Sequence, residues 1–211
     1  MAASSSTTLV SALAARGGSA ETALGIRIAS VLFITVLTIV AAQFSIQLPF
    51  TAVPLTLQPT VVLLGGLALG SRLGSASQIL YLAAGIAGLP VFAASATLPP
   101  GALRLLGPTG GYLMAYPVAA LVTGYLAERG FDRRYLTSVL AMLAGLAIIF
   151  TSGVLWLGLF ARTLTGSAPV GIQAALATGL YPFLLPDTIK LAIAAGFVPA
   201  LWRIVGRSNA R

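Results

Sequence analysis

Asp187 and Lys190 are an acid and a base three residues apart in an apolar stretch that is otherwise almost free of charge. On a helix, this spacing places both side chains on one face, one turn apart. Pro186, just before Asp187, is typical of a first helical turn, where a missing N–H costs little and the helix dipole favours an acid. The carboxylate can accept N–H donors, and the ammonium can pair with a carbonyl or a carboxylate. We therefore interpret the pair as a recognition site for a small ligand with an apolar body and an amide-like or acidic head.

The composition indicates what kind of protein surrounds this pair. Of 211 residues, 58% are hydrophobic and only 8% are charged, and the mean hydropathy is +0.99. These values predict a polytopic α-helical membrane protein, because the apolar runs are continuous rather than alternating as in a membrane β-barrel. Helices of about 20 residues leave no room for a soluble catalytic domain.

Cysteine and histidine are both absent from the sequence. Their absence excludes disulfides, Cys- and His-ligated metal sites and Ser-His-Asp triads. We therefore expect no metal, no cofactor and no enzymatic activity. The net charge of +8 comes from basic residues scattered between apolar runs, which does not favour nucleic-acid binding.

The apolar runs predict an all-α integral membrane protein, with six transmembrane helices in one compact bundle and capping loops on the outer side. The expected spans are 24–44, 58–69, 75–92, 112–126, 136–160 and 186–205, with a short interfacial helix at 170–180. The expected organisation is a flexible cytoplasmic tail (1–23), the transmembrane substrate-binding domain (24–205) and a basic cytoplasmic tail (206–211).

The basic residues in the loops orient the bundle, because cytoplasmic loops are enriched in Lys and Arg. One side carries Arg16, Arg27, Arg72, Arg129, Arg133, Arg134, Arg203, Arg207 and Arg211, and the other carries Arg104 and Arg162. This asymmetry predicts a multi-pass protein of the cytoplasmic (inner) membrane with both termini in the cytoplasm. Asp187 and Lys190 then lie in the outward half of the bilayer.

Two breaks between spans are expected on the same outer side. The linker 47–56 contains Pro49, Phe50 and Pro54, which do not resemble a flexible solvated loop and make the linker a candidate lid. The longer break 93–110 holds Arg104 and ends in a glycine-rich turn. Gly110 and Gly111 belong to that turn, where glycine permits close backbone approach.

Two small groups of residues on the expected helices complete the candidate set. Gln78, Tyr81 and Gly85 are spaced by three and four and share a face, which either bonds a neighbouring helix or lines a ligand pocket. Gly25 and Ala29 form a small-xxx-small pair that either packs inside the bundle or lets a partner helix approach.

Four stretches occur together in a familiar order. They are L-P-F-T-A-V-P-L-T-L-Q (48–58), Tyr81 followed by G-I-A-G-L-P-V-F (85–92), L-G-P-T-G-G-Y-L (106–113) and Y-P-F-L-L-P-D-T-I-K (181–190). Over residues 25–205 the chain resembles the BioY family, the biotin-specific substrate-binding (S) components of energy-coupling factor (ECF) vitamin transporters.

The resemblance implies a six-helix S component that binds biotin at its outer side and has no ATPase of its own. Its partners would be an ECF transmembrane coupling protein and ATP-binding subunits. It also implies that Asp187 and Lys190 hold the ureido ring, through its N–H groups and its carbonyl respectively. Gln78, Tyr81, Gly85 and Arg104 would lie near the ligand.

The resemblance also implies how the ligand carboxylate is held and where the coupling protein docks. The valeryl carboxylate would be held by Arg104 or by the 107–111 turn. Gly25 and Ala29 would take the place of a family Ala-x-x-x-Ala motif that docks the coupling protein.

Three other functions stay open from the residues alone. They are an S component for a different vitamin, a self-sufficient proton-coupled carrier, and a membrane scaffold in which Asp187 and Lys190 form only a structural salt bridge. A proton relay would normally use more than one acid, and the other three acids, Glu21, Glu128 and Asp132, fall at expected cytoplasmic ends.

Overall fold

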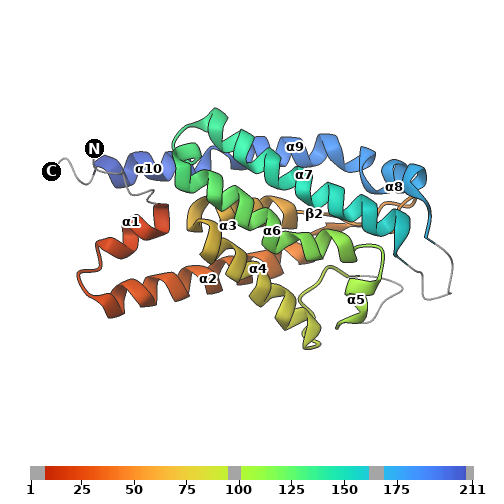
Figure 1. Cartoon of the computed structure of the whole chain (residues 1–211), viewed down its shortest axis with the longest axis horizontal. Helices are drawn as coiled ribbons and strands as arrows, with labels where there is room; N and C mark the ends of the chain where they lie inside the picture. Colours follow the sequence, from red (N-terminus) through yellow and green to blue (C-terminus); the bar gives the residue numbers. More distant parts are fainter. Residues whose placement is uncertain (1–7, 95–100, 162–168, 208–211) are drawn as a thin grey trace.

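The computed structural model describes residues 8–94, 101–161 and 169–207, and these residues are mostly helical (Figure 1). The helices are α1 (Leu9–Ala15), α2 (Ala20–Gln43), α3 (Gln58–Leu69), α4 (Ser71–Ile86), α5 (Leu103–Leu106), α6 (Gly110–Leu126), the wide turn η1 (Ala127–Phe131), α7 (Tyr135–Leu159), α8 (Ile172–Gly179), α9 (Tyr181–Ala194) and α10 (Phe197–Arg207). A two-residue antiparallel ladder joins β1 (Ser45–Ile46) to β2 (Leu55–Thr56). Arg162, residues 1–7 and residues 208–211, which entered the predictions above, lie outside the described part.

Three of the described helical segments are long and apolar enough to cross a membrane. They are Ala20–Gln43, Tyr135–Leu159 and Tyr181–Ile204, the last of which combines α9 and α10. The predicted spans 58–69, 112–126 and 136–160 correspond closely to α3, α6 and α7. Many large apolar side chains of α2 are exposed, such as Leu24, Phe33 and Val40.

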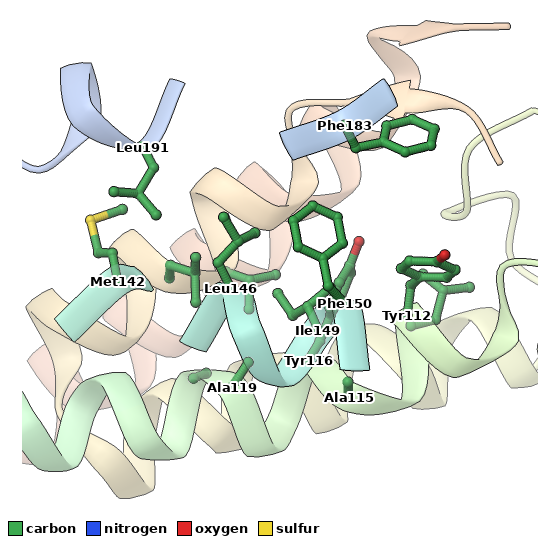
Figure 2. Close-up of a cluster of buried hydrophobic side chains, with 14 of the residues drawn as sticks. Tyr112, Ala115, Tyr116, Ala119, Met142, Leu146, Ile149, Phe150, Phe183 and Leu191 are labelled. Carbon is green, nitrogen blue, oxygen red and sulfur yellow. The ribbon is translucent and has the colours of Figure 1, made fainter. Parts of the chain in front are cut away.

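The core of the bundle lies between α3, α6, α7 and α9. Figure 2 shows Met142 and Leu191 at one end of this core and the rings of Tyr112, Phe150 and Phe183 at the other. In Figure 1 both chain ends and η1 lie at one end of the molecule, and α5 and α8 lie at the opposite end. The aromatic end of the core is therefore well separated from the termini.

Part of the segment 1–23, which was expected to be a flexible tail, is helical in the structure. Residues Leu9–Ala15 form helix α1, which Thr8 caps by accepting a hydrogen bond from the Ser11 N–H at 3.3 Å. The Thr8 hydroxyl also donates to the Leu69 carbonyl at 3.3 Å, and Val10 is buried against α2 and α3. Apolar residues within the segment thus hold it on the bundle.

Helix α4 begins and ends earlier than the predicted span 75–92. The reversal after α3 needs only Gly70, whose φ of 88° lies in the left-handed region that favours glycine, so the helix starts at Ser71. Glu128 accepts hydrogen bonds from the backbone N–H and hydroxyl of Ser71 at 2.8 and 2.7 Å and so caps this start. The helix stops before Gly88 and Pro90, which leaves Phe92 in the following loop.

Candidate ligand-binding site

A cavity of about 190 Å³ lies at the aromatic end of the core. Its apolar walls come from α6, α7, α9 and the loop after α4, and its polar groups come from the β1–β2 linker, α3, α5, α6 and α9. The lining residues are Gln47, Ala52, Val53, Pro54, Thr56, Gln58, Pro59, Phe92, Ala93, Ala94, Arg104, Pro108, Thr109, Tyr112, Leu113, Tyr116, Ile149, Phe150, Phe183 and Asp187. A mostly apolar chamber with a few polar groups is typical of a small-molecule site.

Asp187 projects from α9 into this cavity and is 4% exposed. Its Oδ1 lies 2.5 Å from the Lys190 Nζ, as the i, i+3 spacing predicts. The carboxylate is thus compensated by Lys190 and still lines the cavity. An ionised carboxylate has about four acceptor positions, so one that lines a cavity is suited to a donor from a ligand as well.

Lys190 lies behind Asp187 and is not among the residues that line the cavity. Its ammonium pairs with Asp187 and donates to the carbonyl of Thr56 at 2.5 Å. The expectation that Lys190 itself holds a ligand carbonyl stays a prediction. In this geometry it compensates the charge of Asp187 and fastens α9 to β2.

The position of Asp187 in its helix also differs from the prediction. Helix α9 begins at Tyr181, and Pro182 takes the first-turn position. Pro186 lies inside the helix, and Asp187 follows one residue later, beyond the first turn. The helix dipole acts mainly within the first turn, so Lys190 is the principal charge that compensates this carboxylate.

Arg104 brings a second charge into the cavity from α5. It is 8% exposed, and its Nη1 donates to the carbonyl of Ala93 at 2.7 Å. Burial lowers the pKa of Arg104 from its ordinary value, yet a guanidinium remains protonated at neutral pH. The cavity thus combines an internally compensated acid–base pair with one further positive charge.

Gln78, Tyr81 and Gly85 do not line the cavity. Gln78 is fully buried and donates to the hydroxyls of Thr38 and Ser77, so it bonds α4 to α2. Tyr81 is also fully buried, and its hydroxyl accepts a 2.6 Å hydrogen bond from Gln58, which does line the cavity. These residues therefore lie behind the wall of the cavity, and their direct contact with a ligand stays a prediction.

The two candidate lids contribute only part of their predicted residues. Pro54 lines the cavity, whereas Pro49 and Phe50 are exposed and do not. Gln47 donates to the Ala94 carbonyl at 3.1 Å, which joins this linker to the loop after α4.

The glycine-rich turn is fixed rather than placed over the cavity. Gly110 and Gly111 pack closely against Trp156 of α7, whose indole N–H donates to the Gly107 carbonyl at 2.9 Å. Pro108 and Thr109 line the cavity in their place.

Several lining residues were missed in the sequence. Tyr112 and Tyr116 are four apart on α6, a spacing that places them on one face and could have pointed to them. Gln58, a polar residue at the start of an apolar helix, was a similar signal. Phe150 and Phe183 offered none, because in sequence they cannot be told from core aromatics.

The comparisons with known proteins agree on one family. The model of the BioY family matches residues 13–207. A probable biotin transporter BioY of Pyrococcus horikoshii is 41% identical over 158 residues, which are 75% of this chain and 85% of the relative. The biotin transporter BioY of Thermotoga maritima is 37% identical over 161 residues, which are 76% of this chain and 86% of the relative.

A solved structure has the same fold. It is the crystal structure of the S-component for biotin from an ECF-type ABC transporter, with a TM-score of 0.71 and 24% identity. The match covers 84% of this chain and 90% of that one. With its long apolar helices and its match over residues 13–207, the chain is a membrane protein that belongs to the BioY family.

Proposed function

We propose that this chain is the biotin-binding S component of an ECF-type vitamin transporter and takes part in biotin uptake. The single observation that supports this most is Asp187, a buried carboxylate that is paired with Lys190 and lines the cavity. The ureido ring of biotin offers N–H donors for such a carboxylate. Relatives named as biotin transporters supply the choice of ligand.

The charges of the cavity match those of biotin. Asp187 and Lys190 compensate each other, so the site has one net positive charge from Arg104. The valeryl carboxylate of biotin is negative, and its pairing with Arg104 would leave the occupied site neutral. Charge-assisted hydrogen bonds between a guanidinium and a carboxylate are stronger than neutral ones, so this arrangement favours an anionic ligand over a neutral one.

The aromatic walls suit the rest of the ligand. Phe150 and Phe183 border the cavity together with Tyr112 (Figure 2). The thiophane ring and the valeryl chain are apolar and would bury against these rings, at about 25 cal/mol per Å² of apolar surface. Gln58 and Thr109 add polar groups for the ureido carbonyl and the carboxylate.

The loops and the helices support a membrane arrangement for this proposal. The proposal has six crossings, formed by α2, α3, α4, α6, α7 and the α9–α10 pair, in the cytoplasmic membrane with both termini inside. The described basic residues near the termini and η1 lie at one end of the molecule, and the cavity lies toward the other, outer end. The chain itself hydrolyses no ATP and acts with a coupling protein and ATP-binding subunits.

Gly25 and Ala29 on α2 are proposed to contact the coupling protein. Both are exposed, and no atom lies within 4 Å of a Cβ built on Gly25, so this face is open to a partner helix. Small residues at such a face let two helix backbones approach closely in a membrane.

Biotin titration into the purified protein tests the proposal. We expect saturable binding that riboflavin and thiamine do not displace; displacement by either would indicate an S component for another vitamin. Biotin uptake in a host that lacks every ECF coupling subunit should be absent. Robust proton-dependent uptake in that host would instead favour a self-sufficient carrier.

A further inference from the structure

We infer that Gly85 and Phe92 form a positioning pair: the Phe92 ring rests on the bare backbone of α4 at Gly85 and thereby sets the cavity wall that orients Arg104. Neither residue needs to contact the polar groups of a ligand for this role. The inference rests on the proposed function for its ligand, and it gives Gly85 a role although it lies outside the cavity.

The first step is the contact between α4 and the ring. A Cβ added at Gly85 would come within 2.7 Å of three atoms of the Phe92 ring, a separation that real Cβ atoms do not show. Phe92 is 7% exposed and lines the cavity, so a ring displaced by a Cβ would have to turn toward the cavity. Only glycine at position 85 admits the ring in this place.

The second step is the support that Tyr81 gives to the same loop. Its ring meets the Phe92 ring edge to face, with centroids 5.5 Å apart and planes at 83°. Its hydroxyl donates to the Val91 carbonyl at 3.4 Å and accepts from Gln58. Edge-to-face aromatic pairs are favourable beyond the burial of their surface, so Tyr81 and Gly85 together fasten the loop to α4.

The third step connects the loop to the charge in the cavity. Phe92 and Ala93 both line the cavity, and the Ala93 carbonyl accepts the hydrogen bond from Arg104 Nη1. A displaced Phe92 would move the adjoining Ala93 carbonyl, and with it the guanidinium. Gly85 therefore acts on Arg104 through two residues of the loop.

A double-mutant cycle tests the packing step. Gly85→Ala should lower both the unfolding midpoint and the biotin affinity of the purified protein, with an affinity loss of about tenfold. In the background of Phe92→Ala, where the ring is gone, the same change should cost less than about twofold. Gly196→Ala is the matched control, because its Cβ would have no neighbour closer than 3.8 Å.

A second readout separates orientation of Arg104 from general loosening. Biotinamide lacks the carboxylate charge, so the ratio of biotin to biotinamide affinity reports the Arg104 contact. Gly85→Ala should lower this ratio toward the value of Arg104→Gln. An unchanged ratio, or losses from Gly85→Ala and Phe92→Ala that simply add, would overturn the inference.

The outcomes also distinguish this inference from the proposed function. If the wild type fails to bind biotin, the proposed function fails, and the cycle on the unfolding midpoint, which needs no ligand, still decides whether Gly85 and Phe92 are coupled. If the wild type binds biotin and Gly85→Ala binds it equally well, the inference alone is wrong.

Discussion

Two buried carboxylates, Asp187 and Asp132, lie in different parts of the bundle and have different partners. Asp132 follows η1 at the end that holds the termini, and both of its oxygens have hydrogen-bond donors: Arg133 Nε at 3.2 Å and the Trp202 indole N–H at 2.6 Å. Asp187 is paired with Lys190 through Oδ1 and lines the cavity.

The difference separates a structural contact from a recognition site. The Arg133 guanidinium also lies over the Trp202 ring at 3.5 Å, so Asp132, Arg133 and Trp202 form a closed cluster that holds α10 against the turn before α7. No cavity residue belongs to this cluster. An acid enclosed by donors of the protein stabilises the fold, whereas a paired acid that also lines a cavity can bind a ligand.

The largest expected effect comes from breaking the Asp187–Lys190 pair on one side only. Lys190→Met leaves a buried carboxylate without its cation, which should destabilise the protein by about 3–5 kcal/mol. Adding Asp187→Leu should restore most of that stability, because two apolar residues then replace the pair, but biotin binding should stay lost. Thermal unfolding and biotin titration of the single and double variants check both expectations.

Binding retained in the double variant would show that the pair is only a structural salt bridge. The membrane-scaffold function would then account for Asp187 and Lys190 better than recognition does.

A smaller effect is expected at the other carboxylate. Trp202→Phe removes the indole N–H from the buried Asp132 and should lower stability by about 1–3 kcal/mol. Biotin affinity should stay within about twofold of the wild type, because no residue of the Asp132 cluster lines the cavity. The unfolding midpoint and the titration together measure this, and a large affinity loss would contradict the separation of the two regions.

The smallest expected effect is a pH dependence of stability from Asp132. Burial raises the pKa of its carboxyl, and the Trp202 hydrogen bond and the Arg133 charge only partly oppose this. The folded state therefore binds the proton more tightly than the unfolded state, whose Asp pKa is about 3.9. The stabilisation is present below that value and is lost as the pH rises through the raised pKa.

Comparison with Asp132→Asn isolates this contribution. The midpoint of the wild type relative to the variant should rise as the pH falls from neutral toward about 4. A relative midpoint that falls over this range would mean that the charged form of Asp132 is the one the fold prefers.

The sequence predicted the fold well where apolar length alone decides it. The run 58–69 became α3 residue for residue, and the fifth expected span differs from α7 by one residue at each end. It failed where a local choice decides the boundary. Pro182 rather than Pro186 takes the first turn of α9, and two prolines four apart do not reveal in sequence which of them begins a helix.

The candidate site was predicted in its charges and less well in its walls. Asp187 and Arg104 both line one cavity. Charged side chains are costly in apolar surroundings, so their presence there indicates a site in the sequence already. Gln78, Tyr81 and Gly85 share a face as expected, but spacing on one helix cannot tell which neighbour that face meets. Tertiary packing turned them toward α2 and toward Phe92 instead of toward the cavity.

The most direct test of the central claim is the biotin affinity of two matched variants, Asp187→Asn and Asp132→Asn, measured by calorimetric titration beside the wild type. Each removes one buried negative charge and keeps the side-chain shape. We expect Asp187→Asn to lose affinity by about 100-fold or more and Asp132→Asn to bind as the wild type does. If both variants lost affinity to the same extent, or if both bound biotin as the wild type does, the claim that Asp187 is the acid of a biotin site would be contradicted.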